Sequence, residues 1–291
     1  MPKFLDRLTL LEADCLGRME AAQAAVERIF RLMEKPGTAY GVLCRASGDV
    51  RVLGYYQAYA RGYTHRRITG GPQLSGRNPV YVAVELFYPG LLRSLLSDVY
   101  SVVEEALGVK PSRGYFMGSG VEGVIGVTKL GEVGVIELVA SGGDSVEEVL
   151  KHVLEEGFRH VKTKTSKLEP EDYRNGVGYK SSTWLRYTGA SGSSIRVQVS
   201  SSQGHTLTIG VNMHGVYIVD ARIEGDFYAA PPGEPFSLMA QMEGTQVNEL
   251  MAYQIQLAFR DRVDLAGVEY EHLEEAIGEI YRKAGERVYS S

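Results

Sequence analysis

Apolar residues recur at helical spacing in several stretches of the chain. In residues 16–34 and in residues 91–107 they fall three and four positions apart, which places them on one face of an amphipathic helix. The first stretch is followed by Pro36 and Gly37, a pair that ends helices. A third helix is predicted for residues 144–154, because the acidic residue at its start can cap the first turn.

Alternating apolar residues predict strands between these helices. The clearest case is residues 79–87, where every second residue is valine or leucine, a pattern that predicts a strand with one buried face. Further strand-like runs occupy residues 40–45, 50–56, 123–129 and 134–140. A short turn at residues 47–49 separates the first two of these runs and predicts a hairpin.

The composition changes at about residue 162. Residues 162–182 are polar and have little periodicity, so they are expected to form a linker or surface loop. Strands are predicted beyond it at residues 194–200, 205–212 and 216–224, followed by helices at residues 237–258 and 270–284. Strands followed by helices are typical of a small α+β domain. We therefore predict two domains, an α/β domain in residues 1–162 and an α+β domain in residues 163–291.

Charge, cysteines and hydropathy narrow the class of protein. The formal net charge of −5 argues against a general nucleic-acid binder, which is usually basic. Cys15 and Cys44 do not form a C-x-x-C pair, and no histidine pair has ligand spacing, so we expect neither a disulfide framework nor a metal site. No apolar run is long enough to span a membrane, and charges interrupt the first ten residues where a signal peptide would be apolar. A cytoplasmic location with no membrane partner is the expectation.

Residues 65–71, with the sequence HRRITGG, could bind a ligand. Two adjacent glycines between an arginine pair and a predicted strand allow the backbone to approach a ligand closely. Successive amides in such a turn can cradle an anion, and arginine supplies a forked phosphate donor. A simple turn with two solvated arginines, leading into a strand, explains the same residues. The motif by itself is therefore weak evidence for a ligand site.

Lys129 is the second candidate, since it lies at the end of a predicted strand with Gly131 close behind. A lysine held there beside a cleft can place a compact positive charge against an oxyanion. An exposed lysine at a strand end is the simpler interpretation of the same pattern.

Taken together, these segments resemble the catalytic domain of the biotin/lipoate ligase superfamily. The order is RRITGG (66–71), a strand, an amphipathic helix and a strand that ends in Lys129. In lipoate ligases the loop has the pattern R-R-x-[ST]-G-G-G, and a lysine on the later strand is catalytic. Residues 52–57 (VLGYYQ) are similar to the V-x-G-x-x-Q segment that precedes that loop.

The C-terminal part adds independent support for this resemblance. Residues 219–228 resemble the I-x-G-D-F-F strand end of the lipoate ligase accessory domain, and residues 263–268 continue its pattern. The accessory signature distinguishes lipoate ligases from biotin ligases, whose G-R-G-R-x-G-R loop is absent here. From the residues alone, Asp226 is expected to be a turn carboxylate and Phe227 a core aromatic.

The resemblance implies a fold, a reaction and a set of site residues. The fold is a central mixed sheet flanked by helices, with a small α+β accessory domain. The enzyme is an ATP-dependent lipoate–protein ligase, which uses Mg²⁺ to form lipoyl-AMP and transfers the lipoyl group to a lysine of an acceptor lipoyl domain. Lys129 would stabilise charge on the mixed anhydride. Substrate would contact Gln57, Arg66, Arg67, Thr69, Gly70 and Gly71.

The chain departs from the family pattern in ways that leave other functions open. Pro72 replaces the third glycine and removes an amide donor, and residues 119–123 replace the usual Asn-Asp element near the nucleotide. A non-catalytic protein that binds a lipoyl group or a lipoyl domain is therefore an alternative. An octanoyl or lipoyl transferase is a further alternative, but it needs a thiolate, and neither cysteine lies near the Lys129 segment.

Overall fold

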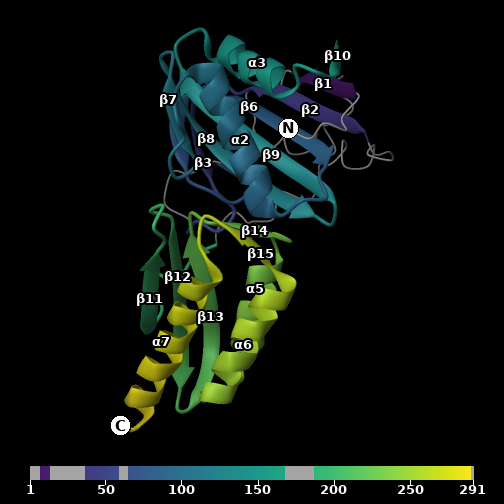
Figure 1. The fold of residues 1–291 in the computed structure, drawn as a ribbon. Coiled ribbons are helices and arrows are strands. Elements are labelled where there is room, and N and C mark those ends of the chain that lie inside the picture. Colours follow the sequence, from purple (N-terminus) through teal and green to yellow (C-terminus); the bar gives the residue numbers. More distant parts are fainter. Residues whose placement is uncertain (1–6, 14–36, 59–64, 168–186, 290–291) are drawn as a thin grey trace.

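The fold was determined as a computed structural model, which describes residues 7–13, 37–58, 65–167 and 187–289. The described residues form two units, an N-terminal unit up to Lys167 and a C-terminal unit from Tyr187 (Figure 1). The helix predicted at residues 16–34 and most of the predicted linker lie outside the described residues.

A seven-stranded mixed sheet forms the centre of the N-terminal unit. In spatial order its strands are β10 (Lys162–Lys167), β1 (Arg7–Ala13), β2 (Thr38–Arg45), β6 (Val80–Phe87), β9 (Val133–Gly142), β8 (Val121–Leu130) and β7 (Tyr115–Gly118). β1 pairs in parallel with β2 and β10, and the other neighbours are antiparallel. The mixed sheet implied by the resemblance is thus confirmed. Residues 162–167, which we expected in the linker, form its edge strand, and the domain boundary at residue 162 stays a prediction.

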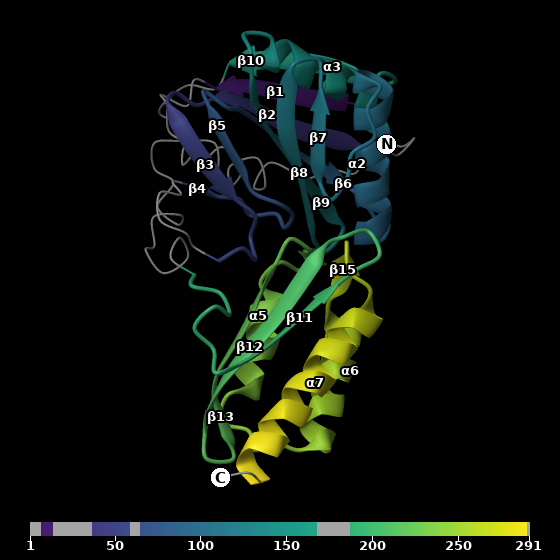
Figure 2. The same ribbon diagram turned by 90° about the vertical axis from the view of Figure 1, so that its left-hand side faces the viewer.

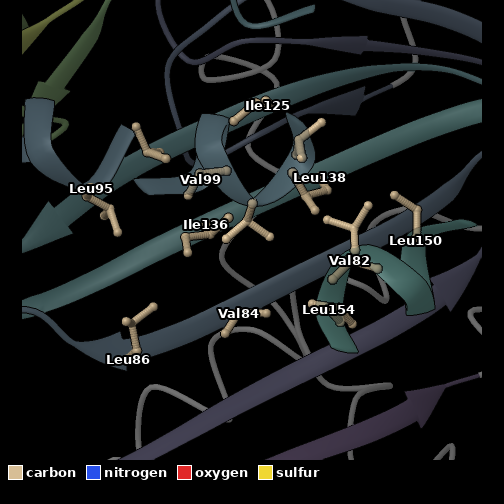
Figure 3. Packing of buried hydrophobic residues seen from close by; sticks show 14 of the residues in the cluster. Val82, Val84, Leu86, Leu95, Val99, Ile125, Ile136, Leu138, Leu150 and Leu154 are labelled. Atoms are coloured by element: carbon tan, nitrogen blue, oxygen red, sulfur yellow. The ribbon is translucent and has the colours of Figure 1, made fainter. Parts of the chain in front are cut away.

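Two helices cover one face of this sheet. They are α2 (Leu92–Leu107) and α3 (Val146–Gly157), close to the predicted helices. Their apolar residues, among them Leu95, Val99 and Leu150, pack on alternate residues of the central strands (Figure 3). Gly108 ends α2 in the left-handed conformation, with φ at 66°.

The other face of the sheet is covered by a small sheet of three strands (Figure 2). Its order is β4 (His65–Arg66), β3 (Asp49–Leu53) and β5 (Leu74–Arg77). This cover corrects two predictions. β6 is buried on both faces rather than one, and β3 pairs with β4 and β5 rather than forming a hairpin with β2. β3 packs on the face of the main sheet and does not join its edge. This placement buries Val50 and Val52.

Cys44 also differs from expectation. Its side chain is buried in β2 and is disulfide-bonded. We expected no disulfide from the cysteine spacing. Spacing along the chain is a poor guide here, because parallel pairing of β1 and β2 places Ala13 beside Cys44.

In the C-terminal unit, three antiparallel strands pack against three helices. The strands are β11 (Ile195–Ser200), β12 (Thr206–His214) and β13 (Tyr217–Gly225), and the helices are α5 (Glu234–Met242), α6 (Glu249–Arg262) and α7 (Tyr270–Tyr289). The predicted helix at residues 237–258 is two helices. It breaks where Gly244 takes a φ of 76° and the Asn248 side chain caps α6 by accepting from the Met251 amide.

The two units share a packed junction. Two short strands, β14 (Tyr228–Ala230) and β15 (Asp264–Ala266), pair with each other and pack on the N-terminal unit, where Tyr228 and Ala266 join its core. Within the described ranges, no helix has both the length and the apolar character needed to cross a membrane.

Candidate functional site

Of the residues that the sequence selected, Arg67, Thr69, Gly70 and Gly71 form a turn over the second face of the main sheet. They belong to residues 67–73, called here the glycine loop, which connect β4 to β5 and contact β8 and β9. Gly126 in β8 permits this contact, because a Cβ there would lie 1.9 Å from Thr69 Oγ1 and 2.5 Å from Arg67 Nη1. The loop therefore lies against the sheet because a central strand lacks a side chain at that position.

A buried carboxylate holds the loop in place. Glu137 in β9 accepts hydrogen bonds from the Thr69 amide at 2.9 Å, from the Thr69 hydroxyl and from the Tyr81 hydroxyl. Burial, with the negative charge of Glu137 beside it, raises the pKa of Tyr81 well above its ordinary value. Glu137 thus uses its oxygens within the protein, and the Thr69 groups are not available to a ligand.

Arg67 is fully buried beside this carboxylate. Its Nη2 donates to the Pro72 carbonyl at 2.6 Å, while Nε and Nη1 have no hydrogen-bond partner within the described ranges. Burial lowers the pKa of Arg67, and the negative charge of Glu137 partly offsets that effect. The positive charge of Arg67 is therefore partly balanced by Glu137 from inside the protein.

Arg66 and Gln57 stabilise the turn that precedes the loop. Arg66 Nη1 donates to the carbonyls of Gly54, Tyr55 and Gln57, and Gln57 Oε1 accepts from the Gly54 amide at 2.8 Å. Burial lowers the pKa of Arg66 to about 10. Both predicted substrate contacts thus have a clear structural role.

The two glycines of the loop pack against the C-terminal unit. The Gly71 amide donates to the Phe227 carbonyl at 3.1 Å, and a Cβ on Gly70 would lie 2.3 Å from the same oxygen. Phe227 is fully buried and stacks on Tyr56 with ring centroids 4.4 Å apart, while Asp226 accepts from the Thr206 amide and pairs with Arg113 at 2.8 Å. These contacts fit the structural roles expected for Asp226 and Phe227.

Lys129 is not brought together with the loop. Alternate residues of a strand point to opposite faces, and Lys129 is three positions from Gly126. Its cross-strand partner is Gly134, which packs against Tyr88 and Leu95 on the α2 side of the sheet. Lys129 Nζ donates to the Gly90 carbonyl and lies 5.9 Å from the centroid of the Tyr88 ring. The sheet therefore separates this ammonium group from the loop.

The sequence did not single out two glutamates on the loop side of the sheet, Glu137 and Glu85. Glu85 in β6 is 1% exposed, and among the described residues neither of its carboxyl oxygens has a hydrogen-bond partner. Burial, reinforced by the charge of Glu137, raises its pKa to about 9. The sequence does place both glutamates inside otherwise apolar strands. A buried charged residue is rare unless it is paired or functional, so their positions could have marked them as candidates.

Between the two units lies a polar pocket of about 340 Å³. Gln57 and Gln73 line it from the N-terminal unit, and Arg196, Thr208 and Glu224 from the open face of the C-terminal sheet. Arg196 is already paired, since its Nη2 lies 2.7 Å from Glu224 Oε1. Of the predicted site residues, Gln57 alone is among its lining residues.

Three positions of the glycine loop lack a free amide that could bind a triphosphate. In the glycine loop the amide of Thr69 is bonded to Glu137, that of Gly71 to Phe227, and Pro72 has none. Across residues 7–13, 37–58, 65–167 and 187–289, no group of three or more His, Cys, Asp or Glu residues could hold a metal ion. At Thr69, Gly71 and Pro72 the loop therefore offers no amide donor to a triphosphate.

Comparison with known proteins identifies the class of fold. No protein-family model and no curated protein sequence matches the chain. LipL1 from P. falciparum, in complex with lipoate, superposes with a TM-score of 0.61 at 10% identity, covering 95% of this chain and 99% of that one. Ta0514 from T. acidophilum, with bound lipoic acid, gives 0.49 at 15% identity over 62% of this chain and 99% of that one. Lipoate-protein ligase A bound with ATP gives 0.47 at 14% identity over 62% and 98%.

The fold is therefore the one seen in LipL1, in agreement with the fold that the sequence resemblance implied. The match to LipL1 extends over both units, so the C-terminal unit belongs to the shared architecture. At 10% identity the likeness is one of fold.

Proposed function

We propose that this protein binds a lipoyl-type acyl group, free or carried by a lipoyl domain, without activating it with ATP. The support for the ligand is the full-length likeness to LipL1 in its complex with lipoate. In this proposal the N-terminal unit holds the ligand, and the C-terminal unit is an accessory domain that fixes the glycine loop.

One observation favours binding over activation: Lys129 and the glycine loop lie on opposite faces of the main sheet. Forming an acyl adenylate requires a cation against the carbonyl and phosphate oxygens at the moment that charge develops there. An ammonium group on the far side of a packed sheet cannot supply that contact. Lys129 instead donates to the Gly90 carbonyl, beside the start of α2.

The charge around the loop supports the same proposal. A triphosphate is strongly anionic, and binding it requires cations or free amide donors. Glu137 lies on this face of the sheet and offsets the positive charge of Arg67. A lipoyl group joined to lysine through an amide carries no charge and avoids this conflict.

Two assays on the same protein test the proposal. Isothermal titration with lipoate and with a lipoylated lipoyl domain should show binding, and lipoate-dependent ATP–pyrophosphate exchange should be absent in the presence of Mg²⁺. The Lys129→Ala variant should bind with unchanged affinity. Absence of lipoyl binding by well-folded protein would refute the proposal.

ATP-dependent lipoate–protein ligase is the second candidate. It is favoured by the match over 95% of this chain to LipL1, which includes both units. The exchange assay distinguishes it directly. Lipoate-dependent exchange that falls about a hundredfold in Lys129→Ala would establish a ligase and assign the lysine to catalysis.

A further inference from the structure

Glu85 lies in the middle of the loop-side face of the main sheet. In β6 it stands between Val84 and Leu86, which pack beneath the helices on the opposite face (Figure 3). Its cross-strand neighbours are Tyr40 in β2 and Val135 in β9. Glu137 is a diagonal neighbour, since it pairs with Ala83 two positions earlier.

The carboxyl group of Glu85 is buried, uncharged and unsatisfied. Burial and the nearby charge of Glu137 raise its pKa to about 9, so the group keeps its proton at neutral pH. A neutral carboxyl offers one O–H donor and one carbonyl acceptor side by side. Both oxygens of Glu85 lack a hydrogen-bond partner in the part of the chain that the structure describes, although buried polar groups are nearly always paired.

The missing partner can be described by its chemistry. A group that presents an N–H and a C=O on the same edge satisfies both atoms of a neutral carboxyl in one reciprocal pair. A primary carboxamide and a cyclic urea have such an edge. A carboxylate has no donor, and it would be desolvated beside Glu137. A dithiolane ring has neither group.

We propose that Glu85 is a specificity-determining residue that pairs with a carboxamide-type N–H/C=O edge of the ligand, so that lipoamide is preferred to lipoate. The choice of lipoamide rests on the proposed function, whereas the edge chemistry rests on Glu85 alone. Glutamine at this position presents the same kind of edge and should preserve the pairing. Leucine fills the same space and removes it.

The test is isothermal titration of the full-length chain with lipoamide, lipoate and biotin, the last of which contains a cyclic urea. Wild type and Glu85→Gln should bind lipoamide at least about tenfold more tightly than lipoate. Glu85→Leu should lose about tenfold or more of the lipoamide affinity while its affinity for lipoate stays unchanged. Circular dichroism and the melting temperature verify that each variant is folded, and leucine in an apolar strand should be tolerated.

Different outcomes separate the two proposals. Lipoamide and lipoate that bind equally, with no change in Glu85→Leu, would overturn the role of Glu85 and leave lipoyl binding intact. Biotin that binds through Glu85 while both lipoyl ligands fail would uphold the edge chemistry and refute the lipoyl proposal. No binding of any of the three ligands would overturn both.

Discussion

Replacing Glu85 with glutamine should stabilise the protein, increasingly so as the pH rises. In the folded chain the pKa of Glu85 is about 9, compared with 4.5 for the unperturbed group. Below pH 4.5 the carboxyl is protonated in both the folded and the unfolded chain, so glutamine and glutamate should be equivalent. Above it the unfolded chain ionises and the folded chain does not, and the wild type loses stability until the pH passes the folded pKa.

The size of the effect follows from the shift. Each pH unit in this window is worth about 1.4 kcal/mol, so the glutamine variant should be more stable by about 3 kcal/mol at pH 7. The neighbouring charged or titratable groups of Glu85 in the described strands are Tyr40, Tyr81 and Glu137. All three are present in both proteins, so the difference between the proteins isolates Glu85.

Urea unfolding followed by circular dichroism at pH 5, 6, 7 and 8 measures the difference. The matched control is Glu132→Gln at the exposed turn between β8 and β9, where the substitution should change the free energy of unfolding little. If Glu85→Gln and wild type gave parallel curves of unfolding free energy against pH, the carboxyl would be ionised in the folded chain. That result would also remove the basis of its pairing with a neutral ligand edge.

Three further substitutions test the packing around the site. Gly70→Ala should lower the free energy of unfolding by at least about 2 kcal/mol, because the new Cβ would lie 2.3 Å from the Phe227 carbonyl oxygen. The control Gly143→Ala, which adds a Cβ in open space, should have little effect in the same urea titration. Asp264→Ala should cost about 1 kcal/mol by removing the side chain that accepts from the Leu92 amide at the start of α2, and Asp264→Asn should restore most of it; equal losses in both would exclude a capping role. Tyr81→Phe should cost about 1–3 kcal/mol by leaving an oxygen of Glu137 buried without its donor, and a neutral result would indicate that water replaces the hydroxyl.

The sequence predicted the elements of this fold well wherever one local pattern decided them. The spacing of apolar residues located α2, α3 and the central strands to within a few residues. It failed at β3 and β10, whose partners are far away in the sequence. The alternation in β3 says that one face is buried, but not which sheet buries it.

The site shows a similar division. The sequence found the glycine loop, because arginine and glycine pairs are visible locally. It could not show that Gly70 and Gly71 contact Phe227, or that Lys129 lies on the far face of the sheet. The face is set by the register of β8 on β9, and a shift of one residue would have reversed it. Glu85 and Glu137 were missed because a single charged residue in an apolar strand is not a motif.

The junction between the two units has a consequence for how the chain unfolds. Backbone and side-chain hydrogen bonds cross it at Gly71, Thr128 and Leu92, and Tyr228 belongs to the apolar core of the opposite unit. Separating the units would leave these groups buried without partners or expose them to water. The stabilities of the two units are therefore coupled, so the chain should unfold in a single cooperative transition. A substitution in the buried part of the C-terminal sheet should then also change how often the glycine loop opens.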